Sequence, residues 1–595
     1  MANAPAQAND STIPNDSRGD VVSFAVLVNG KAIGDELQLV NIVVTYEVNR
    51  IPTARLIFRD GSAAEQTFPV SESSTFVPGN KIEIKLGHDA QNETVFKGVI
   101  VRQSLRARES GDTILTVDCR DEAYLLTLGR HNRYFLDKSD SDAVKEILGG
   151  KAGSIESTAP VHKEVVQYYV TDWDFVLMRG EMNGQLIFVE NGKVNLKKPS
   201  TSTPSVLNLV YGENLREFET DMDARTQIGS VKATAWDYAQ QKLVESDSRS
   251  AGSFSEHGNI TGSKLATDAG LPTLELRHSG NVAQEELKAW ADATMMRSRL
   301  AKICGRAKFQ GSALVLPGKC VDISGMGARF NGKAYVTAVR HEVGAGAWYT
   351  HAQFGLSPTF LYQKQAVAEV PASGLIPSVS GLQIGVVVKL EGDPNGEDRI
   401  QVRLPTLDNQ ANGTWARVST LDAGKERGSY FRPEIGDEVI VAFVNDDPRD
   451  AIVLGMLNSS KNPAPLPTTD DNHIKGFVTR SKMKVLFDDE KKVITIETPA
   501  GNKLVISDDE KSITTTDQTG NTWKMSDSGI EIKSPKDISI EATGKLSLKA
   551  TQDLTIEGLN VKAKASAELA MEGSAKASLK ASGQTEVKGA MVMIN

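Results

Sequence analysis

The stretch that decides the fold is KDISIEATGKLSLKATQDLTI, residues 536–556, close to the end of the 595-residue chain. Apolar residues return in it every eight positions and always as a pair, so we call each eight-residue unit an octad. The two residues of a pair lie two positions apart, which places both on one face of an extended strand. The first rows of pairs are Ile538, Leu546, Leu554 and Ile540, Leu548, Ile556. A fixed period of this kind predicts a stacked β repeat.

The octads continue to the end of the chain after a slip of one residue behind Ile556. The later rows are Val561, Leu569, Ala577 and Ala563, Met571, Leu579, Val587. The predicted stalk core is Ile538, Ile540, Leu546, Leu548, Leu554, Ile556, Val561, Leu569, Met571, Leu579 and Val587. One narrow strand per octad leaves an apolar face and two open edges, and such edges recruit other chains. The pattern therefore predicts an intertwined oligomer, most simply a trimeric β-prism or β-helix in which copies of the chain close the edges.

An Ala/Lys-rich helix is the alternative for this region, because NVKAKASAELAMEGSAKASLKASG (560–583) is full of helix formers. An eight-residue repeat with an internal period of two fits helix geometry poorly, however. Gly544, Gly558 and Gly573 also interrupt the pattern. We therefore favour the β interpretation.

Composition restricts the classes of partner. The net charge of −9 argues against nucleic acid, because phosphate binding needs basic surfaces. Three widely spaced cysteines imply no disulfide framework, which fits folding in a reducing compartment. The first residues lack the basic and apolar regions of a secretory signal, and no run of 18 apolar residues predicts a membrane span. We expect synthesis in the cytoplasm and export by another route.

Shifts in residue pattern divide the chain into seven segments. We expect a mainly β protein with minor α structure, in which alternating strands dominate and two linkers rich in Pro, Ser, Asn and Asp separate the parts. The segments are a disordered N-terminus (1–20), a β region with helices (21–365), a linker (366–380), a small β barrel (381–460), a linker (461–475), a β-meander (476–535) and the octads (536–595).

The β region contains clear local signals. Residues 141–150 predict a helix with Ser141 as its N-cap and Gly149 as its end, and Thr171 and Gly184 bracket a second helix in the same way. Asn191-Gly192 joins two strands as a hairpin. Residues 240–270, rich in Ser and Gly, predict a surface loop, and residues 283–303 predict an amphipathic helix.

The barrel segment has about five strands, which suits an OB-like barrel. It carries 8 Lys/Arg against 13 Asp/Glu, so nucleic acid is an improbable ligand despite the OB pattern. The following meander repeats at nearly 20 residues, aligning KVLFDDEKK, KLVISDDEK and TWKMSDSGI. No break separates it from the octads, so both form one stalk.

At this point the residues resemble a known family. RIQVRLP, WARVST and the long stretch around PEIGDEV (433–439) resemble the OB segment of VgrG-type spike proteins. VVQYYVTDWDFVLMRGEMNGQLIFVENGKVNL (165–196), LPGKCVDISG and FNGKAYVTAVRHEV look like the phage tail hub. The resemblance implies the central spike of a contractile injection system, as in type VI secretion or phage tails. It implies two β-barrel subdomains in the hub region, a homotrimer on the inner tube and baseplate, and a PAAR-type tip protein. Such spikes meet the target membrane transiently, and some carry effector cargo.

The sequence offers little for catalysis. The eight histidines form no zinc-ligand pattern, and neither a GxSxG motif nor a P-loop is present. His341 and His351 lie on predicted neighbouring strands, where a structural role is the better interpretation. The acidic triplets at Asp488 and Asp508 lack the ligand spacing of a calcium loop and are typical of solvated turns. We expect no enzyme activity, no metal and no cofactor.

The end of the chain is apolar. Met591, Val592, Met593, Ile594 and Asn595 would form an exposed platform in the trimer, and we expect it to seat the tip protein because apolar ends need covering. A trimeric tailspike or adhesin that binds glycans is the alternative function. It would need rows of exposed aromatic residues, and no aromatic residue follows Trp523.

Overall fold

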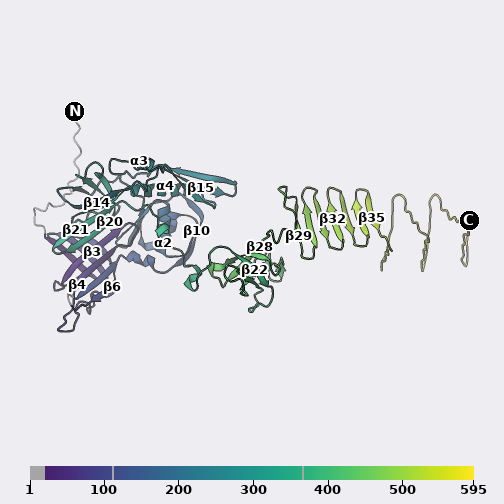
Figure 1. Cartoon of the computed structure of the whole chain (residues 1–595), viewed down its shortest axis with the longest axis horizontal. Coiled ribbons are helices and arrows are strands. Elements are labelled where there is room, and N and C mark those ends of the chain that lie inside the picture. Colours follow the sequence, from purple (N-terminus) through teal and green to yellow (C-terminus); the bar gives the residue numbers. More distant parts are fainter. Residues whose placement is uncertain (1–20, 110–112, 365–366, 595) are drawn as a thin grey trace, which may run out of the picture.

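The computed structural model describes residues 21–109, 113–364 and 367–594. The expected disorder of residues 1–20, the boundary residues 365 and 366, and Asn595 lie outside the described residues. The parts follow one another along the long axis of the molecule: a compact N-terminal region, a small barrel, a ladder of strands and a thin C-terminal end (Figure 1). This order matches the sequence of segments predicted from the residue pattern.

The N-terminal region is built on a sheet of 13 strands. In pairing order the strands are β14 (Leu215–Met222), β18 (Ile303–Gln310), β21 (Ala347–Phe354), β20 (Gly332–Gly344), β3 (Leu39–Glu47), β4 (Thr53–Arg59), β7 (Ile114–Arg120), β6 (Gln91–Arg106), β5 (Lys81–His88), β1 (Val22–Val28) and β2 (Lys31–Ala32), with β19 (Cys320–Ser324) and β13 (Leu207–Val210) branching from β20. Alternate residues are buried, as Ile42, Val44 and Tyr46 are in β3. Two apolar cores lie along the sheet, and β20 contributes Val336 to one and Val343 to the other. The expectation of two separate barrel subdomains stays a prediction.

A second unit of the N-terminal region combines short helices and strands around an apolar core of its own. It comprises η1 (Glu122–Thr127), β8 (His131–Ser139), α1 (Asp140–Leu148), η2 (Gly149–Lys151), β9 (Ala152–Ile155), β10 (Val161–Val170), α2 (Asp172–Met182), β11 (Leu186–Glu190) and β12 (Lys193–Lys197). β8 and β10 form a ribbon, and β11, β12 and β9 form a small sheet. The hairpin signal is confirmed, because Asn191 (φ 50°) and Gly192 (φ 78°) occupy the left-handed turn that joins β11 to β12.

The cap assigned to α1 was wrong by two residues. Ser139, not Ser141, is the N-cap: its hydroxyl accepts from Asp142 N–H and donates to the Asp142 carboxylate. β8 runs directly into the helix, so the cap is also the last residue of a strand. The end at Gly149 and the cap of α2 at Thr171 are confirmed.

A third unit of the region packs a helix on three strands. β15 (Ser230–Asp237), β16 (Lys242–Ser248) and β17 (Thr273–His278) form the sheet, and α3 (Gly262–Asp268) and α4 (Gln284–Leu300) accompany it. The helix predicted at 283–303 is confirmed as α4, whose Leu287, Ala291 and Met295 are buried on the sheet. The surface loop predicted at 240–270 is wrong, because β16 and α3 both fall within it. Backbone pairing of β16 with β15 provides the order that its polar residues do not signal.

The linker and the barrel follow. α5 (Leu361–Lys364) and η3 (Pro371–Gly374) lead into a closed barrel of β22 (Gln383–Lys389), β23 (Ile400–Arg403), β24 (Thr414–Val418), β28 (Ala451–Met456) and β27 (Glu438–Phe443), with β25 (Ala423–Gly424), β26 (Arg427–Gly428) and η4 (Val444–Asp446) in its loops. The five-stranded barrel predicted at 381–460 is therefore confirmed. Val402, Val441 and Val453 are fully buried inside it.

The stalk begins as an antiparallel meander, here called the ladder. Its seven strands pair in chain order: β29 (Ile474–Val478), β30 (Lys484–Asp488), β31 (Val493–Glu497), β32 (Lys503–Ser507), β33 (Ser512–Thr516), β34 (Thr522–Ser526) and β35 (Gly529–Lys533). The predicted meander is confirmed. Beyond it, residues 536–594 contain no strand in the single chain, and every one of them is exposed.

Candidate functional site

The ladder has one apolar face, which the strand register defines. Directly paired residues share a face of an antiparallel sheet. The pairs place two columns side by side: Phe477, Val485, Ile496, Leu504, Thr515, Trp523 and Ile532 in one, and Lys475, Phe487, Ile494, Ile506, Ile513, Met525 and Ile530 in the other. The opposite face carries mostly Lys, Glu, Thr and Ser. The residue pattern is therefore that of a sheet with one face buried and the other in solvent.

Above its lowest rung, this apolar face is left uncovered by the residues that the structure describes. Ile494 is 37% exposed, Trp523 54% and Ile530 70%. Monomeric soluble proteins rarely expose a continuous apolar surface of this kind, so it marks an interface.

The octads continue the residue spacing of these two columns in the sequence. Ile530 and Ile532 in β35 are followed eight residues later by Ile538 and Ile540, and the period continues from there. The predicted stalk core residues are all exposed in the single chain, between 55% and 83%: Ile538, Ile540, Leu546, Leu548, Leu554, Ile556, Val561, Leu569, Met571, Leu579 and Val587. The single chain does not bring them together, and their role as a shared core stays a prediction.

The apolar end of the chain is open as well. Met591, Met593 and Ile594 are at least 79% exposed and Val592 is 48% exposed. Asn595, the last residue predicted for this platform, lies outside the described residues. The docking role of the platform stays a prediction.

The barrel contacts the base of the ladder through two side-chain pairs. The rings of Phe431 and Phe477 stack with centroids 5.3 Å apart, and Arg480 Nη1 lies 2.8 Å from Glu434 Oε2. Phe477 belongs to the first strand of the apolar face, so the barrel loop covers its lowest rung. The sequence analysis missed this joint, although the aromatic pair Tyr430-Phe431 in a loop was a visible signal.

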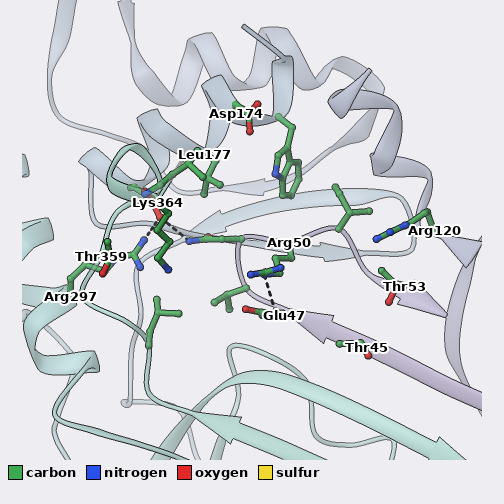
Figure 2. A pocket seen from close by; sticks show the side chains of 17 residues that line it. Thr45, Glu47, Arg50, Thr53, Arg120, Asp174, Leu177, Arg297, Thr359 and Lys364 are labelled. Atoms are coloured by element: carbon green, nitrogen blue, oxygen red, sulfur yellow. Dashed lines mark hydrogen bonds and ion pairs between the residues drawn. The ribbon is translucent and has the colours of Figure 1, made fainter. Parts of the chain in front are cut away.

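The N-terminal region contains a cavity of about 590 Å³ between β3, α2 and residues 356–364 (Figure 2). Its most buried charges are Glu181 and Arg297, which form an ion pair. The Glu181 carboxylate also accepts from Asn49 Nδ2 (3.2 Å) and Leu361 N–H (2.8 Å). Burial lowers the pKa of Arg297, against the opposing effect of Glu181. The contacts of Glu181 join α2 to α4, to the loop at Asn49 and to the segment at Leu361. We therefore interpret the charges in this cavity as structural.

A second polar cluster ties the ribbon to the helices. Asp140 accepts from Arg179 Nε (2.6 Å) and Asn183 Nδ2 (2.8 Å), and His162 Nε2 lies 3.2 Å from it. Burial alone would raise the pKa of Asp140, but the hydrogen bonds from His162 and Arg179 outweigh burial and lower it to about 2. The same contact with Asp140 raises the pKa of His162. The cluster is a paired, buried network of the kind that specifies packing.

The strands that carry His341 and His351 are neighbours, as predicted, but the register places the two side chains on opposite faces of the sheet. His341 pairs with Thr350 and Arg340 with His351 across β20 and β21. His341 is buried, its Nδ1 lies 3.0 Å from Thr350 Oγ1, and burial lowers its pKa to about 4. The structural interpretation of His341 is confirmed.

The acidic triplets lie in the turns of the ladder. Asp488 accepts from the backbone N–H of Lys491, as a turn residue does. Among the residues that the structure describes, no three His, Cys, Asp or Glu side chains gather in a way that could hold a metal ion. In the same residues, no helix is both long and apolar enough to cross a membrane.

Comparison with known proteins supports the division into parts. Residues 18–345 match the model of the Alg8 N-terminal domain, which covers more than half of the chain. Residues 383–457 match the type VI secretion system/phage-baseplate injector OB domain. The second match coincides with the closed barrel.

Curated relatives include spike proteins. The chain is 24% identical to the type VI secretion system spike protein VgrG1b of Pseudomonas aeruginosa over 65% of this chain and 54% of that protein. It is 33% identical to the actin cross-linking toxin VgrG1 of Vibrio cholerae over 22% of this chain and 12% of that protein. The chain thus spans about half of the length of VgrG1b and a smaller part of the toxin.

Comparison with solved structures finds a tail protein of Neisseria meningitidis (TM-score 0.42, 14% identity, 56% of this chain and 97% of that one). A component of the type VI secretion system of E. coli has a TM-score of 0.36 at 14% identity, over 73% of this chain and 99% of that one. At these TM-scores the two likenesses support no conclusion about this chain. The two family-model matches cover the N-terminal region and the barrel in the order in which the structure has them. The curated relatives that the chain matches include VgrG spike proteins. The chain belongs to the VgrG and phage tail hub-spike family.

Proposed function

We propose that this chain is the central spike of a contractile injection system and works as a homotrimer. The observation that carries the proposal is the apolar face of the ladder, whose spacing the octads continue in the sequence. It is uncovered in one chain, and three copies with their apolar columns turned inward would bury it and remove the open strand edges. Closed rotational symmetry is the usual arrangement for such self-complementary surfaces.

The mechanical role follows from this geometry. A spike that punctures a membrane on sheath contraction must carry axial load without bending. In a three-sided prism each layer is hydrogen-bonded to the layers above and below, and three chains share the load. The N-terminal region and the barrel would form the wide base that sits on the inner tube and baseplate, in the order seen along the molecule (Figure 1).

The apolar end fits a tip protein. Three copies of Met591–Ile594 would present a small apolar platform, and a PAAR-type tip would cover it. Deletion of residues 591–595 is expected to abolish co-purification of the tip protein and leave the trimer intact. Tip binding that survives the deletion would contradict the docking role.

The chain is a scaffold in this proposal and carries out no reaction of its own. The buried carboxylates of Glu181 and Asp140 are paired with the guanidinium groups of Arg297 and Arg179. It would be made in the cytoplasm, leave the cell with the injection particle, and meet the target membrane only during firing. Effector cargo is a further partner of this role, and nucleic acid is not.

The mass of the purified full-length chain tests the proposal. Native mass spectrometry or sedimentation at micromolar concentration should give three times the chain mass of 64.2 kDa. A stable monomer at that concentration would refute the shared stalk. The matched variant Ile532→Asp, which places a charge on the apolar face, is expected to return the mass to that of one chain.

A further inference from the structure

The charged residues of the octads follow a pattern that their apolar rows do not explain. Six successive octads carry two or more charges of one sign each, and the sign alternates from one octad to the next. The charges are Asp537 and Glu541, Lys545 and Lys549, Asp553 and Glu557, Lys562 and Lys564, Glu568 and Glu572, and Lys576 and Lys580. The alternation continues across the one-residue slip behind Ile556. All of these residues are exposed in the single chain.

These charges lie on the side of the strand opposite the apolar rows. In the first octad Ile538 and Ile540 point to one face, so Asp537 and Glu541 point to the other. The same odd spacing holds in each of the six octads. In a stalk whose apolar columns turn inward, the charges therefore line the outer surface.

The rotational symmetry of the proposed trimer, on which this inference rests, determines which octads become neighbours. Rotation about the stalk axis keeps height along that axis, so a given octad lies at the same height in all three copies. The layer above it then holds the next octad, whichever copy supplies the adjacent strand. Neighbouring strands lie about 4.8 Å apart. An acidic octad is consequently flanked above and below by lysine octads.

The ladder shows the same arrangement within one chain. Lys484 in β30 pairs with Glu497 in β31, and Glu497 pairs with Lys503 in β32. The Lys484 ammonium lies 3.7 Å from the Glu497 carboxylate. At the top of the ladder, Lys524 pairs with Glu531. Opposite charges on directly paired strands stabilise a sheet, and like charges destabilise it.

We propose that the alternating octad charges form a register code for assembly with further copies of this chain. The apolar rows alone repeat every eight residues and would tolerate a slip of one whole octad with little loss of burial. Wherever the adjacent strand belongs to another copy, such a slip places acidic octads beside acidic octads and lysine octads beside lysine octads. The charges thus reject the commonest wrong register, which is how strand pairing is specified where a repeat leaves it open.

A swap that keeps composition tests the code in the full-length protein. The variant Lys545→Asp, Lys549→Glu, Asp553→Lys and Glu557→Lys exchanges the charges of the second and third octads. It turns two attractive layer contacts into repulsive ones and leaves the net charge unchanged. The control variant inverts all charges from Asp537 to Lys580, lysine to glutamate and acid to lysine. It changes every charge and keeps the alternation.

In low salt we expect the swap variant to lose the trimer at a temperature about 5 °C or more below that of the parent protein. The difference should shrink in about 1 M salt, because ions screen exposed charges. The inverted variant should behave like the parent, and a swap variant that fails to assemble beside an assembling inverted variant also supports the code. Equal stability of swap and parent in low salt, or an inverted variant that does not assemble, would overturn it. A parent chain that is itself monomeric would instead refute the proposed trimer.

Discussion

The barrel and the stalk use the same kind of strand and close it differently. In the barrel, β22 to β28 curl until Val402, Val441 and Val453 are fully buried by their own chain. In the ladder, strands of similar length and alternation form an open sheet, and Ile494 and Ile530 remain exposed. The alternation of apolar and polar residues therefore predicts that one face of each strand is covered. It does not predict which part of the structure covers that face. The strand pairing determines which surface covers the face. In the barrel β28 pairs with β24 and closes the sheet, whereas in the ladder only consecutive strands pair.

The largest expected effect comes from a charge on the stalk face. Ile506→Asp places three carboxylates in one layer of the proposed trimer. If each costs about 2 kcal/mol on burial, association should weaken by about 10⁴-fold. Sedimentation over a range of concentrations measures this change.

The control for that variant is Thr514→Asp on the opposite face of the ladder, which should leave association unchanged. If both variants associate equally well, the apolar face is not the interface. If both variants dissociate, the prediction that only the apolar face takes part in association is wrong.

A charge in the barrel core should act within each chain. Val441 is fully buried, so Val441→Asp should destabilise the barrel by about 4 kcal/mol. Urea unfolding followed by a probe in the barrel would detect the loss, and the loss should not depend on protein concentration. A concentration-dependent loss would mean that the barrel, like the stalk, depends on neighbouring copies.

Low pH should reduce the folding stability of the N-terminal region through Asp140, which has no counterpart in the proposed stalk interface. The folded pKa of Asp140 is about 2, below its ordinary value of 3.8, so its ionised form stabilises the fold above pH 3.8. That stabilisation, about 2 kcal/mol, is lost as the pH falls from 4 through 2. His162, whose pKa is raised, acts in the opposite direction at a higher pH and does not contribute to this window.

Unfolding free energy measured against pH in the acid range should therefore show a slope that Asp140→Asn reduces. Glu164→Gln is a suitable comparison because Glu164 lies on the exposed side of β10. A slope that is identical in the parent and in Asp140→Asn would mean that the cluster does not contribute to stability in acid.

The sequence predicted those elements whose signals are local. The turn at Asn191-Gly192, the cap at Thr171 and the five barrel strands depend on neighbouring residues, and the structure has all of them. The strand at Lys242–Ser248 was missed because only backbone pairing with β15 orders its polar residues. The cap of α1 was misplaced because Ser139 ends a strand and begins a helix at once.

The stalk shows a different limit. Its apolar rows were predictable residue by residue, but a local pattern cannot say which chain supplies the covering surface. The charge alternation was equally visible in the sequence. Its meaning depends on which strands become neighbours, and the Lys484–Glu497 contact of the ladder supplies that information.

The smallest expected effect comes from changes at the contact between the barrel and the base of the ladder. Phe431 of the barrel stacks on Phe477 of the ladder, and the exposed Arg480–Glu434 pair lies beside them. Exposed ion pairs contribute little, so Arg480→Ala should change stability by less than about 1 kcal/mol, and salt should mask even that. Phe431→Ala should cost more, about 1 kcal/mol, because it removes a ring contact and uncovers the lowest rung. Limited proteolysis at the 461–473 connection should then accelerate for Phe431→Ala and stay unchanged for Arg480→Ala. The reverse order would mean that charge, and not the covering of an apolar rung, holds the barrel to the stalk.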